Sequence, residues 1–282
     1  MQKRAIAIHD ISCVGRCSLT VALPILSAAG VNTSIVPTAL LSTHTGEFTG
    51  YTHLDLSDQL LPIAKHIATL GLHFDALYSG YLASPAQVEL VLQMIGLLCD
   101  SQTHVFVDPA FADHGKLYSL MDPTMPSRMR ALCARAHTIV PNLTEAAFIL
   151  GEPYLASGYQ EAYVLDLARK LSQIGPESIV ITDISLDPAQ TGIAVYHRLS
   201  DDFRLLFRPK FEGVFHGTGD VFASFLLSLL LSGKPLMEAA SLALDFIHAS
   251  IGYTLEGGEP LRYGVQFEYV LPRLMAAVRS RE

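Results

Sequence analysis

Charge is what this chain has least of. Only 16% of its 282 residues are charged, the net charge is −8, and lysine and arginine nowhere gather into a stripe. A nucleic-acid partner is therefore disfavoured, because phosphate backbones are bound by clustered positive charge. Long polar tracts are absent as well, and 50% of the residues are hydrophobic. This composition argues against disorder and is ample for a substantial core.

Long hydrophobic runs and paired cysteine motifs are also missing. The longest apolar run, residues 225–231, is far shorter than the ~20 residues of a membrane-spanning helix. The apolar stretch in the opening MQKRAIAIHDIS is too short for a signal peptide. No CxxC occurs, and a metal pair formed by Cys13 and Cys17 lacks a second ligand pair at zinc spacing. We expect a cytoplasmic protein with no membrane partner and four reduced thiols, Cys13, Cys17, Cys99 and Cys133.

Several nucleotide-binding and hydrolase motifs are absent. The chain has no GxxxxGK[ST], because Lys116 and Lys234, which each follow a glycine, precede Leu and Pro. The stretch GTGDVF departs from GxGxxG at Phe222, and HRD, DFG, GxSxG and HExxH do not occur. These absences weigh against a P-loop enzyme, a Rossmann dehydrogenase, a protein kinase and an α/β hydrolase.

What the chain does have is a regular alternation of strand-like and helix-like segments. We expect strands at residues 4–11, 34–42, 75–81, 103–108, 137–142 and 178–183, then an antiparallel pair at 192–199 and 203–211. We expect helices at residues 18–29, 57–70, 85–99, 143–150, 159–174, 219–231, 236–254 and 267–279, with Pro62 leaving a later start of the second one open. This order predicts one α/β domain over residues 1–282, with a mostly parallel sheet covered on both faces.

Polar residues follow six successive strand candidates. Because ligands of such sheets gather beyond the carboxyl ends of the strands, this pattern predicts a polar ligand site. Turn chemistry is the competing interpretation, and Asn142 with Glu145 also matches a capping box. The strand-end residues are Asp10 and Ser12, His44 and Thr45, Tyr81, Asp108, Asn142, and Thr182.

The turn Gly217-Thr218-Gly219-Asp220 opens directly onto the apolar helix at 219–231. Glycines let backbone N–H groups converge on an anion, and the start of a helix carries unpaired N–H groups and partial positive charge. The turn is therefore a candidate phosphate cradle. Asp220 has two interpretations that the residues alone leave even: a helix-capping acid, or a general base that takes a proton from an attacking hydroxyl.

The GTGD turn resembles the anion hole of the ribokinase-like superfamily, and within it the chain resembles the pyridoxal, pyridoxamine and pyridoxine kinases. The stretches that carry the resemblance occur in family order and cover most of the chain. They are HDISCVGRCSLTVALPILSAAGV, PTALLSTHTGEFTGYTH, DALYSGYLAS, DPAFADHGKLY, VPNLTEAAFILG, SIVIT and FHGTGDVFASFL. The resemblance implies a ribokinase-like three-layer αβα sandwich and ATP-dependent phosphorylation of the 5′-hydroxymethyl group of a B6 vitamer.

The resemblance also implies roles for individual residues. Asp220 is expected to be the catalytic base, ionised at neutral pH if its pKa is the ordinary one, and Gly217, Thr218 and Gly219 are expected to hold the transferring phosphoryl group. Ser12, His44, Thr45 and Tyr81 are expected to line the substrate pocket. The expected ATP-binding residues are Asp108, Asn142, Glu145, Thr182, Lys210, Phe211, Phe215 and Thr218, with Asp108 and Glu145 holding Mg²⁺ partly through water.

The same resemblance implies a homodimer, a monovalent cation such as K⁺ as a further cofactor, and a lid within residues 109–126. Two other functions stay open at this point: a hydroxymethylpyrimidine kinase of thiamine synthesis and a catalytically silent vitamin-binding protein. A sugar kinase is disfavoured, because no early set of acids is placed to bind several hydroxyls.

Overall fold

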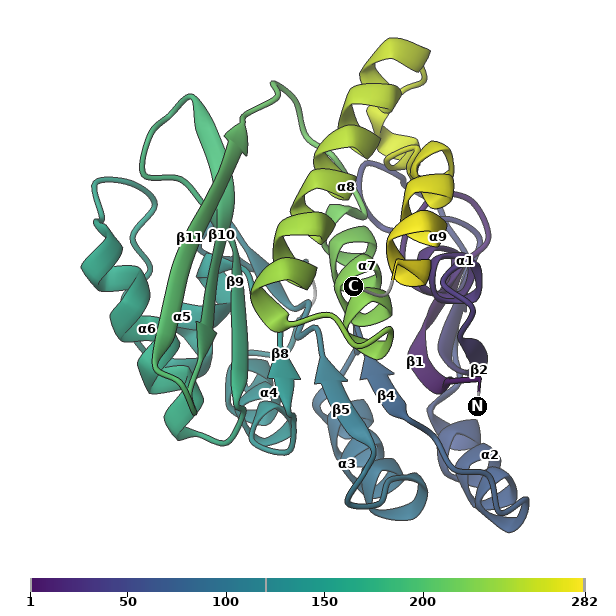
Figure 1. The fold of residues 1–282 in the computed structure, drawn as a ribbon. Coiled ribbons are helices and arrows are strands. Elements are labelled where there is room, and N and C mark those ends of the chain that lie inside the picture. The colour runs from purple at the N-terminus through teal and green to yellow at the C-terminus, as the bar shows by residue number, and fades with distance from the viewer. Residues whose placement is uncertain (1, 120, 281–282) are drawn as a thin grey trace.

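A nine-stranded β-sheet forms the centre of the computed structural model, which describes residues 2–119 and 121–280 (Figure 1). The strand order is β11-β10-β9-β8-β5-β4-β1-β2-β3. The strands from β9 to β2 in this order run parallel, which confirms the expected mostly parallel sheet. The bounds are β1 Arg4–Ser12, β2 Asn32–Leu41, β3 His53–Asp55, β4 Ala76–Ser79, β5 His104–Val107, β8 Thr138–Ile139, β9 Ser178–Ile184, β10 Gln190–His197 and β11 Asp202–Pro209.

Antiparallel strands close the sheet at both edges. The strands β10 and β11 form the antiparallel pair expected from the sequence, and β10 also pairs antiparallel with β9. At the other edge β3 pairs antiparallel with β2. The strand β1 lies between β2 and β4, and Ala5, Ile6, Ala7 and Ile8 are fully buried. Its unbroken apolar run reflects this position, since a parallel strand covered on both faces has no solvent side.

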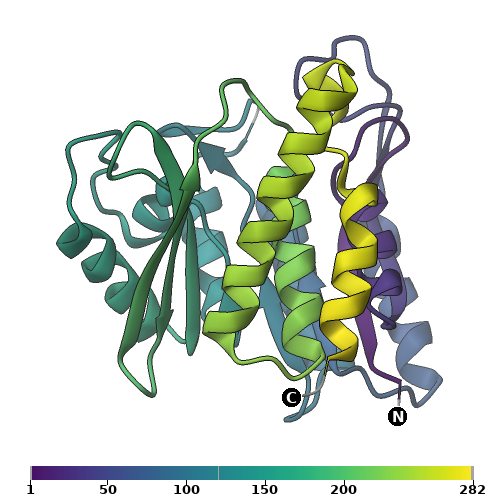
Figure 2. The same ribbon diagram turned by 45° about the horizontal axis from the view of Figure 1, so that its top comes forward.

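Helices cover the two faces of the sheet in separate layers (Figure 1). One layer holds α1, α7, α8 and α9, and its side chains form one apolar cluster with one face of the sheet. The other holds α2 to α6 and forms a second cluster. Figure 2 shows α8 and α9 running along the first face with α7 beneath them. The bounds are α1 Leu19–Ala28, α2 Ser57–Thr69, α3 Pro85–Leu98, α4 Met125–Cys133, α5 Leu143–Leu150, α6 Glu161–Gln173, α7 Thr218–Leu231, α8 Leu236–Gly257 and α9 Leu271–Arg279.

The helix α2 begins at Ser57 in spite of Pro62. Because Pro62 is exposed, water can satisfy the backbone carbonyl that loses its hydrogen-bond partner to the proline.

Several short elements were not predicted from the sequence. The segment predicted as a lid, of which residue 120 lies outside the described residues, contains a small hairpin and the start of α4. This hairpin is β6 Ala112–Asp113 and β7 Lys116–Leu117. Short 3₁₀ helices, η1 Leu261–Tyr263 and η2 Phe267–Val270, precede α9.

The structure also addresses the expectations about thiols and membranes. The four cysteines are free, and Cys17 and Cys133 are buried. Across residues 2–119 and 121–280, no helix combines the length and the apolar character that crossing a membrane requires.

Candidate active site

The turn before α7 depends on a glycine at position 217. Gly217 has φ 72°, in the left-handed region, and a Cβ there would overlap the carbonyl oxygen of Arg16. Thr218 begins the helix, and its hydroxyl donates to the carbonyl of Phe215 at 3.3 Å. The N–H groups of the first turn have no acceptor within the helix, and the helix dipole adds partial positive charge. The turn therefore has the backbone arrangement of an anion-binding helix start.

Asp220 lies in this first turn and is held from another part of the chain. Its Oδ2 accepts the backbone N–H of Ser18 at 2.9 Å. Desolvation and repulsion from Asp10 raise the pKa of Asp220 to about 7, although the Ser18 N–H lowers it. The expectation of an ordinary pKa is therefore wrong, because the desolvation arises from packing that the sequence does not show. A carboxylate with this pKa accepts a proton well near neutral pH.

A second carboxylate, Asp10, lies at the end of β1 beside Asp220. Its Oδ1 accepts the Ser18 hydroxyl at 2.5 Å, and its Oδ2 accepts the Ser12 hydroxyl at 3.1 Å. Burial raises the pKa of Asp10, against the lowering effect of these two hydroxyls. Ser18 therefore joins the two carboxylates through its hydroxyl and its N–H. The sequence indicated Asp10 only as a strand-end residue and gave no sign of a role for Ser18. The bond between the Ser18 N–H and Asp220 joins residues 202 positions apart, which no local motif can reveal.

Two of the residues predicted to hold the substrate are engaged by the protein itself. Ser12 is fully buried, with its hydroxyl directed to Asp10. The His44 Nε2 lies 2.6 Å from the carbonyl of Arg262, and its Nδ1 accepts the N–H of Gly46 at 3.1 Å. This pairing requires a neutral ring that carries its proton on Nε2, and desolvation lowers the pKa of His44 in agreement with it. The two contacts therefore hold the His44 ring in one orientation.

The other two predicted substrate residues are more accessible. Thr45 follows His44 in the loop after β2 and is exposed. Tyr81 follows β4 and is partly buried, with its ring centre 6.5 Å from that of Tyr118. Burial raises the pKa of Tyr81, and Asp10 adds to this rise. Because β4 lies next to β1 and runs parallel to it, Tyr81 follows the end of β4 at the same edge of the sheet as Asp10.

Buried carboxylates meet where β5 ends. Burial raises the pKa of Asp108 well above its usual value, and the charges of Asp220 and Glu145 add to the rise. Glu145 accepts backbone N–H groups of Phe111 at 2.8 Å, Ala112 at 3.3 Å and Asn142 at 2.9 Å. Burial raises the pKa of Glu145 to about 7 in spite of these three bonds. A concentration of carboxylate oxygens with raised pKa values fits a divalent cation that prefers oxygen ligands.

Glu145 and Asn142 form the capping box of α5 that the sequence indicated. The Asn142 Oδ1 accepts the Glu145 N–H at 2.9 Å, and the Asn142 Nδ2 donates to the carbonyl of Ala112 at 2.7 Å. Both side chains thereby tie the hairpin of β6 and β7 to the start of α5. Both oxygens of Glu145 accept backbone N–H groups, three in all, whereas Asp108 accepts the N–H of Ala110. Asp108 is therefore the better candidate of the two for a direct metal bond.

The remaining predicted nucleotide residues lie on two sides of the site. Thr182 bridges to Asn142 across neighbouring strands, which joins it to the capping box. Lys210 and Phe211 follow β11, and the Phe211 ring packs against His248 of α8 with 4.6 Å between ring centres. Phe215 packs onto the apolar cluster beneath α7 and α8. The structure therefore groups Thr182 with Asn142 and Glu145, and Phe211 and Phe215 with α7 and α8.

A further group of potential metal ligands lies outside this set. Atoms of Asp113, His114 and Asp183 lie within 4.8 Å of one another. All three residues are exposed. We assign no metal to them, because exposed acidic groups meet in this way without an ion.

Fold and site together define a class. Parallel strands end at an acidic cluster, and beside it a glycine turn opens a buried helix with a carboxylate in its first turn. This arrangement, in a three-layer αβα sandwich, is that of the ribokinase-like fold. The chain belongs to the phosphomethylpyrimidine kinase family, whose model matches residues 23–262.

Known proteins similar to the chain agree with this assignment. A pyridoxal kinase of Rubrobacter xylanophilus is 28% identical over 242 residues, which cover 83% of this chain and 81% of that protein. A crystal structure from Bacteroides thetaiotaomicron, described as a phosphomethylpyrimidine kinase and containing pyridoxal, is 36% identical with a TM-score of 0.92 and covers 97% of this chain and 96% of that one. The crystal structure of pyridoxal kinase from Lactobacillus plantarum is 29% identical with a TM-score of 0.89 and covers 98% of both chains.

Proposed function

We propose that the protein is a vitamin B6 kinase, which transfers the γ-phosphoryl group of ATP to the 5′-hydroxymethyl group of pyridoxal, pyridoxamine or pyridoxine. The observation that carries this proposal is the position of Asp220, a desolvated carboxylate in the first turn of α7 with a pKa raised to about 7. Such a group beside an anion-binding turn is suited to phosphoryl transfer to an alcohol. Its product would serve the salvage of the vitamin.

The chemistry follows from the positions of the turn and the acid. Asp220 takes the proton of the substrate hydroxyl as that oxygen attacks the γ-phosphorus. The N–H groups of Gly217, Thr218 and Gly219 stabilise the charge on the transferring phosphoryl group. Asp10 and Ser18 hold the base, since Ser18 bonds both carboxylates. Phosphoryl transfer depends mainly on alignment and charge stabilisation, and these residues provide both.

The vitamer occupies the space beyond the ends of β1, β2 and β4. Thr45 and Tyr81 are the accessible members of the predicted pocket, and His44 forms a wall through its fixed neutral ring. Ser12 acts through Asp10, because its hydroxyl is directed to that carboxylate. An aromatic side chain at the end of β4 suits stacking on a pyridine ring.

ATP and Mg²⁺ occupy the other half of the site. Asp108 would bind Mg²⁺ directly and Glu145 through water, while Thr182 and Asn142 contact the phosphates. When bound, the metal neutralises charge on the phosphate oxygens. Lys210, Phe211 and Phe215 lie between β11 and α7 and would pack around the nucleotide.

Several broader expectations belong to the same proposal. The chain acts as one kinase domain over residues 1–282, with a lid within residues 109–126. It works as a cytoplasmic homodimer and uses a monovalent cation such as K⁺ as an additional cofactor.

A coupled assay of ADP release tests the proposal. With pyridoxal, pyridoxamine, pyridoxine and hydroxymethylpyrimidine offered separately with ATP and Mg²⁺, we expect turnover with at least one vitamer at a higher kcat/KM than with the pyrimidine. The pyrimidine is the second candidate substrate, because the family is described as phosphomethylpyrimidine kinase and phosphomethylpyrimidine is its phosphate ester. Preference for the pyrimidine would reassign the substrate. If the protein binds a vitamer but turns over none of the four compounds, the result would favour a silent vitamin-binding protein.

A further inference from the structure

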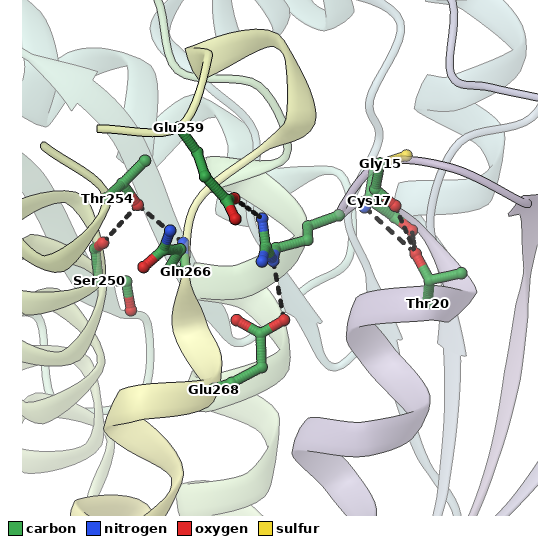
Figure 3. Close-up of polar contacts among 9 residues, drawn as sticks. Gly15, Cys17, Thr20, Ser250, Thr254, Glu259, Gln266 and Glu268 are labelled. Atoms are coloured by element: carbon green, nitrogen blue, oxygen red, sulfur yellow. Dashed lines mark hydrogen bonds and ion pairs between the residues drawn. The ribbon is translucent and has the colours of Figure 1, made fainter. Parts of the chain in front are cut away.

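Arg16 lies in the loop between β1 and α1 and forms ion pairs with two glutamates from the far end of the chain. Its Nε donates to Glu268 Oε1 at 2.7 Å, and its Nη1 donates to Glu259 Oε2 at 3.2 Å (Figure 3). Glu259 follows the end of α8, and Glu268 lies in η2. These partners are 243 and 252 positions away. One guanidinium therefore joins the first loop to residues 259–268, which we call the C-terminal strap.

The backbone of Arg16 contacts the same strap. Its N–H donates to the carbonyl of Tyr263 at 2.9 Å. Gly264 lies so close that a Cβ there would be 2.7 Å from the Arg16 carbonyl oxygen. Side chain and backbone of one residue thus hold the strap, and the contact requires a glycine at 264.

The strap has its own anchor in the core. Thr254 is buried in α8, donates its hydroxyl to the carbonyl of Ser250 at 2.7 Å and accepts the N–H of Gln266 at 2.7 Å (Figure 3). The strap is therefore fixed against α8 independently of Arg16. Because the strap is fixed in this way, its contacts with Arg16 fix the loop between β1 and α1 relative to α8.

The other side of Arg16 faces the anion-binding turn. Its carbonyl oxygen occupies the place where a Cβ of Gly217 would lie, and two residues later the N–H of Ser18 donates to Asp220. The strap also accepts the Nε2–H of His44 at the carbonyl of Arg262. Both loops that border the substrate half of the site are thus attached to the strap.

We propose that Arg16 is a positioning residue, which holds the first loop against the C-terminal strap so that the Ser18 N–H and the Gly217 turn keep Asp220 in place for proton transfer. This inference rests on the proposed kinase function. Arginine suits this position because its planar guanidinium presents separate nitrogens in a fixed geometry to the two glutamates, whereas a lysine ammonium is a single charge on a flexible stem. The side chain of Arg16 is 25% exposed and those of Glu259 and Glu268 are about half exposed, and such ion pairs add little to folding stability.

Substitution of Arg16 tests this role. In Arg16→Met the alkyl stem remains and the ion pairs are lost, so we expect kcat to fall by up to about 100-fold, because small misplacements of catalytic groups have effects of this size. The KM for ATP should change much less than kcat, and Arg16→Lys should restore part of the loss. Arg169→Met is the matched control, since Arg169 makes a comparable multi-contact ion pair with Asp201 away from the site.

The pH profile separates positioning from a general loss of stability. The Ser18 N–H and Asp10 act on the pKa of Asp220, and the charge of Asp220 acts in turn on its neighbours Cys17, Tyr78, Asp108 and Tyr118. Of these, the Ser18 N–H lowers the pKa of Asp220, so loosening the loop should move the acidic limb of kcat/KM to higher pH in Arg16→Met. The double variant Glu259→Gln/Glu268→Gln should show the same shift and add nothing to Arg16→Met.

Two results would overturn the inference. One is an Arg16→Met enzyme with the kcat and acidic limb of the wild type. The other is a loss that Arg169→Met reproduces and that follows the unfolding midpoint. If Arg16→Met fails to fold, Arg16→Lys and the two-glutamine variant carry the test. A wild-type chain that phosphorylates no vitamer would instead remove the proposed function, and this inference with it.

Discussion

At the scale of single residues, the neighbours of Asp220 determine the pKa of its carboxyl group. Packing withdraws water from its carboxylate, Asp10 repels its charge, and one backbone N–H from Ser18 partly compensates. Without these contacts an aspartate loses its proton at about pH 4 and is a weak base at neutral pH. The network of Asp10, Ser18 and Asp220 therefore converts an ordinary helix-start acid into a proton acceptor matched to neutral conditions.

The raised pKa of Asp220 predicts the pH dependence of catalysis. A base must be deprotonated, so kcat/KM should fall as the pH drops below about 7. The profile should be measured with pyridoxal and with pyridoxine, because an ionisation of the enzyme appears at the same pH with both vitamers. An acidic limb near pH 4 with both would contradict the desolvated environment of Asp220.

At the scale of elements, the start of α7 combines two functions in one turn. Gly217 adopts a left-handed conformation, and its missing Cβ makes room for the backbone of the first loop. The same turn presents the free N–H groups of the helix. The end of α7 offers an internal comparison, because Gly233 also has a positive φ, of 94°, but its Cβ position is open.

Alanine at each end of α7 should separate these effects. Gly217→Ala and Gly233→Ala both place a side chain at positive φ, which costs about 1 kcal/mol each. Only Gly217→Ala also collides with Arg16, so it should lower kcat strongly, whereas Gly233→Ala should leave kcat unchanged. Steady-state kinetics with thermal unfolding of both variants checks this. Equal activity of the two variants would mean that the turn at 217 does not shape the site.

At the scale of the whole molecule, alternating strands and helices made the layered architecture readable from the sequence. The hairpin of β10 and β11 was predictable because its strands are long and the polar turn signal Ser200-Asp201-Asp202 stands between their apolar runs; in the structure residues 198–201 separate the two strands. The strand β3 and the hairpin of β6 and β7 escaped prediction, since two or three residues show no periodicity. The GTGD turn was visible as a local motif.

What local motifs could not show are contacts between distant parts of the chain. The bonds of Arg16 to the C-terminal strap and of Ser18 to Asp220 join residues more than 200 positions apart. The same holds for the pKa values, because desolvation depends on which elements cover a carboxylate. The sequence therefore indicated which residues gather at the strand ends, while their protonation and support became clear only from the fold.

The most direct test of the account is Asp220→Asn. The amide oxygen can still accept the Ser18 N–H, so the fold should persist, and loss of a desolvated charge should raise the unfolding midpoint more at pH 8 than at pH 5. Turnover of every vitamer should fall by about 10²–10⁴-fold, the range for loss of a general base. Calorimetry should find ATP with Mg²⁺ bound as in the wild type. An Asp220→Asn enzyme that retains most of its kcat would contradict the assignment of Asp220 as the base.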